Sequence, residues 1–566
     1  MSVISLTSGR LARTVRSPLG IVVAVTLWRV LAAWLAPVAQ DEAYYYDWSR
    51  ALAWGYFDHP PGVALLGIGA QLLPGSILAA RLGTLLVSTL TLLALWRLYY
   101  VCGIRREPLL SLSMLLATAT LPGLLSGVLT TPDTVLALFW VLALHEALAA
   151  LQDGQERQRW RWLSAGAATG LGLLGKYTMA MIGPVFLLAL LSLDRRALRT
   201  PWPYLGGLVA LLVFLPNLVW NAQHDWLALR FQFGHGFTTD TGPLTLPVDE
   251  LLGAAELHAG EHANPASFDT GEGLTGIGSF LLVQLLFWGV PSLVALAAPF
   301  TGACWVQSLA GMRDSLSAPG KVLLASAALT PLVLFGSIAA VNSVEANWPA
   351  LYIVGAAPLL AAAVRPLARW AVAGAVTNVL LLSLYAAHAT TAAMPLPHKA
   401  DRVLRETHGY PALAARVAEV AHGPLFADRY QTAAMLNFYG AGAPATQWPG
   451  LARPSEYGLG SIVPIPSLDE LRQTGFTLVV WKYAVPNIPG FQRTESETLY
   501  DCRGLPLHRF PGIGWPDVSP CGDHWLHIWR ILRYEGQDLS RARESSSPPV
   551  RHAAQTARQI AVTGRS

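Results

Sequence analysis

Charged side chains are scarce in this sequence. Of its 566 residues only 13% are Asp, Glu, Lys or Arg, whereas 53% are hydrophobic. A soluble globular chain usually carries about 25% charged residues. The shortage is greatest in the first ~390 residues, where apolar runs of about 17–25 residues, long enough to span a bilayer, recur. The composition therefore argues against a soluble protein, and the small net charge of +4 does not suggest a nucleic-acid partner.

A cleavable signal sequence is also missing. Arg10, Arg13 and Arg16 precede the first apolar stretch, but that stretch continues to Val38 without a small-residue cleavage site. Such a segment is typical of a signal anchor, which stays in the membrane.

Cysteine is nearly absent, with four residues in the chain. Because disulfides form in oxidising compartments and cytoplasmic thiols stay reduced, their positions bear on topology. Cys102 and Cys304 fall on the side that we predict to be cytoplasmic. Cys502 and Cys521 fall outside, and we expect them to be bonded, closing an irregular loop of about twenty residues.

Long apolar segments dominate what is present. Hydropathy predicts eleven of them, at 18–39, 76–100, 108–127, 134–151, 162–175, 177–193, 203–221, 277–300, 321–341, 348–364 and 370–393. The fifth and sixth are short, and Lys176 and Tyr177 fall where they meet. A non-helical break at membrane depth is tolerated only inside protein or beside water. We therefore predict two short or tilted helices that meet at Lys176.

Basic residues mark one side of this membrane protein. With a cytoplasmic N-terminus, eleven crossings place every basic connection inside, as the positive-inside rule requires. These inside connections are Arg105–Arg106, Arg157–Arg161, Arg195–Arg199, Arg313–Lys321 and Arg365–Arg369. The outside connections are 40–75, 128–133, the break at Lys176, 222–276, 342–347 and everything after residue 394.

The region 395–535 has a different pattern. Short β-like runs, such as Phe476–Val480 and Trp525–Leu532, alternate with helical stretches. We predict a soluble α/β domain outside the membrane here. It would follow a transmembrane domain at 1–394 and precede a disordered tail at 536–566 that is rich in Ser, Arg and Pro.

The first outer loop concentrates acids and aromatic residues. Asp41 and Glu42 emerge directly from the first membrane helix, and Asp58–His59 follow after an aromatic run. One interpretation is that the first two acids cap the next helix and favour its N-terminus. That interpretation explains one acid but neither Asp58–His59 nor the aromatic density, so a functional site is the alternative.

This loop resembles that of a known family. The string DEAYYYDWSRALAWGYFDHPPGVALL, at 41–66, is similar to the first outer loop of bacterial membrane glycosyltransferases related to protein O-mannosyltransferases. The aminoarabinose transferase that modifies lipid A is a relative. Further similarities follow in order at Arg81, Thr131–Asp133, Gly172–Tyr177, Asn217–Asn221, Glu345–Pro349 and Asp428–Gln431. The resemblance implies a GT-C fold, a polyprenyl-phosphate sugar donor and a catalytic acid in the first outer loop.

The catalytic candidates are carboxylates. A site on the outer face has no access to cytoplasmic nucleotide sugars, so its donor must be carried by a lipid. The acceptor hydroxyl needs a base or an orienting carboxylate. Asp41, which by resemblance is the family's essential loop aspartate, is the first candidate, and Glu42 is the second. By resemblance the family's second outer acid is Asp133, whose alternative role is the N-cap of the fourth helix.

The departing phosphate needs positive charge beside it, and the cationic candidates are Lys176, Arg81 and His59. A lysine that faces lipid costs roughly 2.5–3.5 kcal/mol, so Lys176 should face a polar cavity unless it snorkels to the surface. In the aminoarabinose transferase the position of Asp58–His59 is Glu-Lys, close to the donor phosphate. The change to His weakens the charge that His59 offers at neutral pH.

Other parts of the site are less specific. Asp58 and His59 could hold a divalent cation, although two ligands make no metal site without further partners; no other cofactor is expected. The further candidates for lining the site are Tyr44, Tyr45, Tyr177, Glu345 and Asn347. The acidic loop 234–276 contains metal-binding residue types at Glu256–His262, but a solvated lid that shapes acceptor choice is the preferred interpretation.

The sequence therefore predicts a mainly α, polytopic protein of the bacterial inner membrane, with a GT-C fold, about eleven transmembrane helices and a C-terminal periplasmic α/β domain. It would move a sugar, with inversion, from a polyprenyl-phosphate donor to lipid A, another lipid or glycan, or a protein. The rival is a transporter or flippase of lipid-linked sugars, with charges on broken helices at the midplane; only Lys176 fits that pattern. A binding or assembly protein would need no essential acid.

Overall fold

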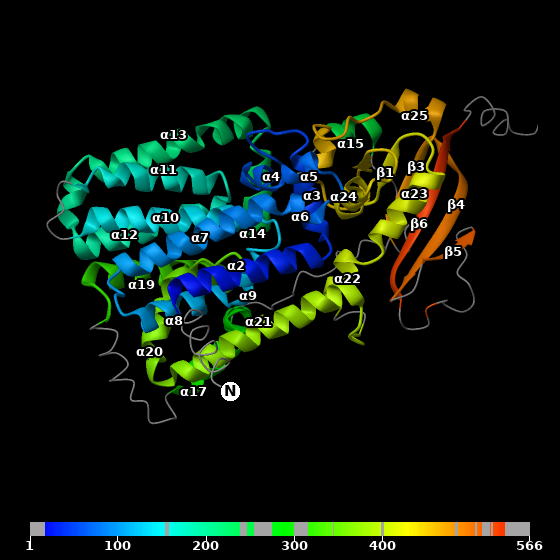
Figure 1. Cartoon of the computed structure of the whole chain (residues 1–566). Helices are drawn as coiled ribbons and strands as arrows, with labels where there is room; N and C mark the ends of the chain where they lie inside the picture. Colours follow the sequence, from blue (N-terminus) through cyan, green and yellow to red (C-terminus); the bar gives the residue numbers. More distant parts are fainter. Residues whose placement is uncertain are drawn as a thin grey trace, which may run out of the picture.

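The structure is a computed structural model that describes residues 17–152, 158–237, 246–253, 274–298, 315–342, 344–397, 401–481, 485–503, 507–511, 521 and 525–537. A large bundle of helices forms one part of the molecule, and a twisted sheet flanked by helices forms the other (Figure 1). Short helices from the first outer loop lie between the two parts (Figure 1). Most of the expected acidic loop 234–276, Cys304 and the tail after residue 537 lie outside the described residues.

Each of the eleven expected apolar segments is helical over most of its described residues. Six described helices are long and apolar enough to cross a membrane alone, or seven if a pair bent by 106° forms one span. The six are α2 (Pro18–Leu35), α7 (Leu82–Val101), α10 (Pro132–Leu151), α13 (Trp202–Gln223), α19 (Ala318–Ile338) and α21 (Ala368–Thr391), and the bent pair is α16 (Leu274–Trp288) with α17 (Val290–Ala297).

The remaining four apolar helices are short. They are α8 (Glu107–Thr118), α11 (Arg161–Leu173), α12 (Ile182–Leu193) and α20 (Tyr352–Ala363). A full crossing takes about 20 helical residues, and these helices have 12 or 13. The predicted positions are thus confirmed, whereas the described helices that can cross by themselves number six or seven rather than eleven.

The long helices present one apolar face outward. On α7, Leu82, Leu86 and Leu90 are exposed, while Leu85 and Leu92 on the other side are buried. Water disfavours such contiguous apolar surface on a soluble protein, and lipid does not. The exposed stripe therefore supports a multi-pass membrane protein.

The basic connections gather at one end of the bundle. The backbone N–H of Ser317 donates to the carbonyl of Cys102 (2.8 Å), which joins the connections after α7 and before α19. Arg159 pairs with Asp194 (3.6 Å), which joins those before α11 and after α12. This end lies away from the sheet (Figure 1), as the positive-inside assignment requires. Cys102 is buried and has a free thiol.

The part that we predict to lie outside the membrane, called the outer part or outer domain below, contains a mixed six-stranded sheet in the order β2-β1-β3-β6-β4-β5. Its first three strands in that order are parallel, and β6, β4 and β5 are antiparallel to their neighbours. The strands are β1 (Leu425–Ala427), β2 (Ala445–Gln447), β3 (Phe476–Trp481), β4 (Phe491–Cys502), β5 (His508–Pro511) and β6 (Trp525–Gly536). The predicted β-like runs are confirmed as β3 and β6, and the predicted disulfide joins Cys502 to Cys521.

Alternation along β3 gives the sheet two buried faces. Val479 packs on the side of α24 (Tyr430–Tyr439), whereas Leu478 and Val480 pack into a second core on the opposite side. Helix α24 in turn packs against α3 of the first outer loop (Figure 1). The outer part is therefore built directly onto that loop. Its other helices are α22 (Arg402–Thr407), α23 (Tyr410–Val420), η6 (Glu456–Leu459) and α25 (Leu468–Thr474).

The first outer loop folds into short helices that cover the end of the bundle. They are α3 (Gln40–Trp48), α4 (Gly62–Leu66), α5 (Gly69–Leu72) and α6 (Ile77–Ala80). Three further short segments complete the outer side: α9 (Leu121–Leu125), α14 (Leu227–Phe237) and α15 (Pro247–Leu252). The 3-10 turns η2 (Tyr177–Met181), η3 (Arg195–Arg199) and η5 (Arg365–Leu367) link membrane helices.

Candidate active site

Helix α3 sorts the acids of the first outer loop onto different faces. Residues three and four apart lie on one side of a helix, so Asp41, Tyr44 and Tyr45 share one face. Tyr46 and Asp47 lie on another side. Helix α3 begins where Ala39 leaves an extended conformation, and Glu42 Oε2 accepts the backbone N–H of Ala39 at 3.1 Å. Glu42 thus supplies the capping role that the sequence allowed for one of the two acids.

Glu42 and Arg81 form a buried, hydrogen-bonded ion pair. Glu42 is 1% and Arg81 0% exposed, and Arg81 donates to both carboxylate oxygens. Glu42 also accepts the Tyr46 hydroxyl (3.0 Å) and the Thr130 backbone N–H (2.9 Å). The other donors of Arg81 reach the carbonyls of Ala33, Ala36 and Pro37.

A guanidinium has five N–H donors, and all five of Arg81 are used by the protein. Arg81 therefore has no donor left for a phosphate, and Glu42 has no exposed oxygen for a substrate proton. In the structure both residues hold the loop on the membrane helices, and their assignment to catalysis and phosphate binding stays a prediction.

Asp41 has different surroundings. Its side chain is exposed, and the Tyr430 hydroxyl donates to Oδ1 at 3.1 Å. Crowding by the surrounding protein, followed by the nearby charge of Glu406, raises the pKa of Asp41, while Arg453 and Tyr430 oppose the rise. Asp41 is therefore an accessible carboxylate in contact with the outer domain, where it can meet a substrate and accept a proton.

Asp58 links the first loop to the outer domain. It is 5% exposed; Oδ1 pairs with Arg453 Nη1 at 2.8 Å and Oδ2 accepts the Tyr44 hydroxyl at 2.8 Å. The same hydroxyl accepts the backbone N–H of Glu456. Both oxygens of Asp58 are thus occupied by protein donors. Within the described ranges, no three His, Cys, Asp or Glu side chains form a group that could hold a metal ion, so the predicted cation at Asp58 and His59 gains no further ligand.

His59 is neutral and lies near two cations. Burial, then the charges of Lys176 and Arg453, lower the pKa of His59 to about 3. Its ring lies 6.0 Å from that of Tyr45. The Nδ1 atom of His59 is buried, and no hydrogen-bond partner for it occurs in the described part of the chain. Buried polar atoms are normally satisfied, so this nitrogen is available to a ligand.

A close approach of two glycines brings the first loop to the membrane break. The backbone N–H of Gly62 donates to the carbonyl of Leu174 at 2.8 Å. A Cβ on Gly62 would lie 2.9 Å from the Cα of Gly175, which is too close for a real side chain. The chain at Lys176 is extended between α11 and η2, so the predicted non-helical break is confirmed.

Lys176 forms an ion pair at this break. Its side chain is 6% exposed, and Nζ lies 2.8 Å from Asp133 Oδ1. Asn347 Nδ2 donates to the other oxygen of Asp133 at 3.0 Å. The N-cap of α10 is Thr131, so the alternative that Asp133 is this cap is wrong. Three residues predicted from distant parts of the sequence are therefore brought together.

The other predicted residues border this region. The Tyr177 hydroxyl accepts a hydrogen bond from Asn221 Nδ2 at 3.4 Å, and Asn221 lies on α13. Glu345 is exposed, and its charge, like that of Asp41, acts on Arg402 at the start of α22. Glu345 thus lies at the open side of the region.

The sequence did not predict the residues that the outer domain contributes. Arg453 pairs with Asp58, and its guanidinium carbon lies 4.3 Å above the centre of the Tyr430 ring. Tyr430 belongs to a short motif of the resemblance, Asp428–Gln431, so a signal for it existed. Arg453 follows β2 in an irregular segment, where neither periodicity nor spacing distinguishes it.

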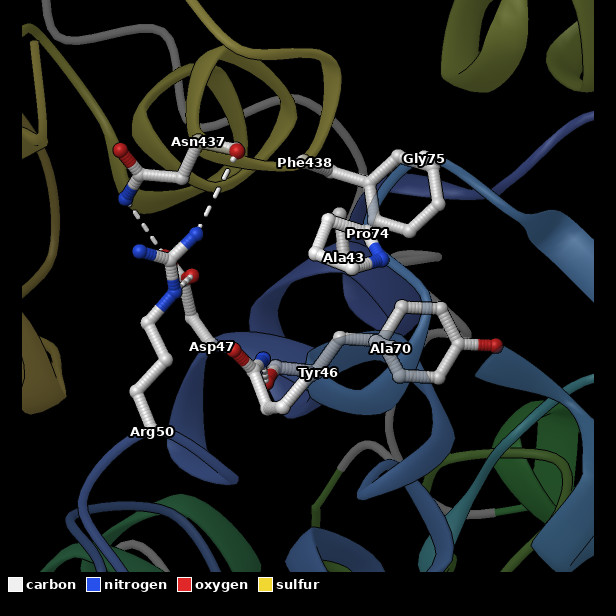
Figure 2. Close-up of a pocket in the computed structure, with 10 residues that line it drawn as sticks. Ala43, Tyr46, Asp47, Arg50, Ala70, Pro74, Gly75, Asn437 and Phe438 are labelled. Atoms are coloured by element: carbon white, nitrogen blue, oxygen red, sulfur yellow. Dashed lines mark hydrogen bonds and ion pairs between the residues drawn. The ribbon is translucent and has the colours of Figure 1, made fainter. Parts of the chain in front are cut away.

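A separate cavity lies behind α3. It has a volume of about 170 Å³, and Asp47, Arg50 and Asn437 line its polar side, as Figure 2 shows. Arg50 Nε pairs with Asp47 at 2.7 Å, and Asn437 and Tyr457 donate to the other Asp47 oxygen. Because these partners satisfy the Asp47 carboxylate, the cavity adds nothing to the site on the Asp41 face.

Comparison with known families gives a consistent result. Residues 58–220 match the family described as dolichyl-phosphate-mannose-protein mannosyltransferase. This segment includes Asp58, His59, Asp133 and Lys176, and it ends within α13.

Two curated relatives are similar over part of the chain. The lipid A galacturonosyltransferase RgtD of Rhizobium johnstonii is 33% identical over 221 residues, which cover 38% of this chain and 45% of that protein. The undecaprenyl phosphate-alpha-4-amino-4-deoxy-L-arabinose arabinosyl transferase 1 of Sodalis glossinidius is 27% identical over 199 residues, 34% of this chain and 35% of that protein. The matches thus span less than half the length of these relatives.

Solved structures extend the likeness to most of the fold. ArnT from Cupriavidus metallidurans bound to undecaprenyl phosphate has a TM-score of 0.55 and 15% identity, covering 82% of this chain and 93% of that one. Its apo structure has a TM-score of 0.53 and 18% identity, covering 82% and 92%. The resemblance found in the first outer loop is therefore confirmed, and the chain has the GT-C fold of the ArnT structures.

Proposed function

We propose that this chain is a glycosyltransferase that moves a sugar from a polyprenyl-phosphate-linked donor to a lipid or glycan acceptor at the periplasmic face of the bacterial inner membrane. One observation carries the proposal. Asp41 is an accessible carboxylate with a raised pKa that accepts a hydrogen bond from Tyr430 of the outer domain, with Arg453 acting on its charge.

The proposed reaction is a single displacement. The acceptor hydroxyl attacks the anomeric carbon of the donor sugar, and its proton passes to Asp41. The bond between that carbon and the phosphate oxygen breaks, and the polyprenyl phosphate leaves with the electron pair. One displacement inverts the anomeric configuration. A base whose pKa is raised toward the working pH accepts a proton more readily.

The cationic end of the site would receive the phosphate. Lys176 lies at a break between short helices with only a small part of its side chain exposed, and a buried cation needs anionic or polar partners. Asp133 supplies one partner in the structure. A donor phosphate beside His59 would be the second, and it would satisfy the unpartnered Nδ1.

The identity of the substrates rests on the relatives. The curated relatives are named for transfer to lipid A and for an undecaprenyl-phosphate-linked aminoarabinose, and one ArnT structure is titled as bound to undecaprenyl phosphate. These names favour a polyprenyl-phosphate donor and a lipid A acceptor. The sugar is not specified by any described contact.

The direct test compares lipid A and other surface glycolipids, by mass spectrometry, from cells with and without the chain. The expected result is a sugar-sized mass that requires the chain and disappears in Asp41→Asn. Asp469→Asn is the control, because Asp469 is an exposed acid on α25 that pairs only locally with Arg472. A transporter would instead move the donor lipid chemically unchanged, and Asp41→Asn would leave the mass in place.

The periplasmic location of the outer domain has its own test. The Cys502–Cys521 bond should make both thiols unreactive in intact cells until a reductant is added. Labelling that depends on reduction alone supports the location. Labelling that requires opening the inner membrane would place the site in the cytoplasm and contradict a lipid-carried donor.

A further inference from the structure

The outer domain contacts both Asp41 and Asp58 of the first loop. Tyr430, at the start of α24, donates to Asp41, and Arg453, in the segment after β2, pairs with Asp58. These contacts join residues that are almost four hundred positions apart in the chain. The site is therefore shared between the membrane helices and the outer domain.

The basic residues near Asp41 and Asp58 differ in how strongly they are already bound. Arg81 is sealed by five protein acceptors, and His59 carries no charge at neutral pH. Lys176 is paired with Asp133 and is nearly buried. Arg453 keeps 39% of its side chain exposed while its Nη1 contacts Asp58. Arg453 is thus more accessible than Arg81 and Lys176, the other two charged residues of this group.

The surroundings of Arg453 hold its guanidinium in one plane. It lies over the Tyr430 ring at 4.3 Å and near the Phe231 ring at 5.3 Å. Stacking on aromatic faces restricts an arginine without using its N–H groups. Its charge acts on Asp41, Tyr44, Tyr45 and His59, so Arg453 lies within electrostatic reach of all four residues.

We propose that Arg453 is a donor-phosphate ligand, held by Asp58 in the unliganded protein and turned to the phosphate when the lipid donor binds. This inference rests on the proposed function and assigns the phosphate contact that His59 cannot supply as a cation. It also makes the outer domain part of the binding machinery.

The charge change of the reaction suits an arginine at this position. The donor phosphate is a diester with one negative charge, and the departing polyprenyl phosphate is a monoester with up to two. Arginine can bind two phosphate oxygens at once through parallel N–H bonds, so its interaction strengthens as the bond to the sugar breaks. Asp58 would keep the guanidinium at the site between turnovers.

The test measures binding of undecaprenyl phosphate, with undecaprenol as the uncharged probe, to the full chain in nanodiscs. Arg453→Gln should weaken undecaprenyl phosphate binding by about 10–100-fold, the range of a lost charged hydrogen bond, and leave undecaprenol binding unchanged. Arg453→Lys should restore part of the loss. Arg472→Gln, which removes a similarly exposed arginine of the outer domain, should have no effect.

Asp58→Asn separates a ligand role from a structural one. If Arg453 binds the phosphate, releasing it from Asp58 should preserve or strengthen undecaprenyl phosphate binding, in contrast to Arg453→Gln. If the pair only fastens the domains together, both variants should lose binding alike, which would overturn the proposal. Equal binding by Arg453→Gln and the unchanged protein would also overturn it. Failure of the unchanged protein to prefer undecaprenyl phosphate over undecaprenol would instead count against the proposed function itself.

Discussion

Asp41 and Glu42 are neighbours in the chain, yet the two sides of α3 give them opposite environments. Glu42 faces the membrane helices, is buried and accepts hydrogen bonds from Arg81, Tyr46, Thr130 and Ala39. Asp41 faces the outer domain, is exposed and accepts a hydrogen bond from Tyr430. A buried carboxylate whose oxygens accept several hydrogen bonds holds a loop in place, whereas an accessible carboxylate with few partners can react. The difference lies in what each side of the helix meets, because both residues are acids.

This comparison predicts a separation of activity from stability, which is its largest expected effect. Asp41→Asn should reduce turnover by about 10²–10⁴-fold, the usual contribution of a general base, and leave the melting temperature unchanged. Glu42→Gln should lower the melting temperature, because it leaves Arg81 as a buried charge without its partner, while the folded fraction keeps its activity. Turnover per folded molecule and thermal unfolding in detergent measure the two effects. Equal turnover losses in both variants would remove the distinction.

The buried pair of Glu42 and Arg81 can also be broken by replacing the arginine. Arg81→Gln leaves the Glu42 carboxylate buried without its cation, and breaking a buried pair in this way costs about 3–5 kcal/mol. The double variant with Glu42→Gln should lose less than the sum of the single losses, since the two residues are coupled. Additive losses in thermal unfolding would show that the pair does not act as a unit.

The sequence predicted the elements of the fold better than the contacts within the site. Apolar length and basic connections located the helices, because both follow from the bilayer. The same signals could not show that α8 and α20 are too short to cross alone, since helix ends depend on packing. Arg81 has a residue type suited to phosphate, and only the structure shows that all its donors are used.

The residues that the outer domain contributes to the site were the hardest to predict from the sequence. Asp41 lies in a specific motif at the membrane exit, and Lys176 interrupts an apolar run, so both stand out in the sequence. Arg453 reaches Asp58 only because the outer domain packs against α3 through α24. No local pattern encodes a contact between segments so far apart, which is why the sequence did not reveal it.

The ion pair of Lys176 and Asp133 is intermediate in exposure between the buried Glu42 and the exposed Asp41. It is less sealed than the pair of Glu42 and Arg81, since Asp133 is 24% exposed. Lys176→Ala should weaken binding of undecaprenyl phosphate by about 10–100-fold, as expected for one charged hydrogen bond. Asp133→Asn frees the lysine and should not weaken this binding. If Lys176→Ala alters only expression and not affinity, the lysine is structural.

The smallest expected effect concerns the hydrogen bond that distinguishes Asp41 from a fully exposed acid. Asp41 must be ionised to act as a base, so activity is lost as the pH falls through its pKa. The hydroxyl of Tyr430 lowers that pKa against the effect of crowding, and Tyr430→Phe should therefore move the acidic limb of kcat/KM to higher pH. The shift should be about one pH unit, because a hydrogen bond to an ionised carboxylate contributes about 1.5–3 kcal/mol, the protonated acid keeps part of that bond, and one pH unit corresponds to about 1.4 kcal/mol. Tyr457→Phe is the matched control: Tyr457 donates to Asp47 at 2.6 Å on the other side of α3, so the limb should stay in place. A limb that is unmoved in Tyr430→Phe, or that moves equally in both variants, would show that Asp41 is not the group whose ionisation limits the reaction.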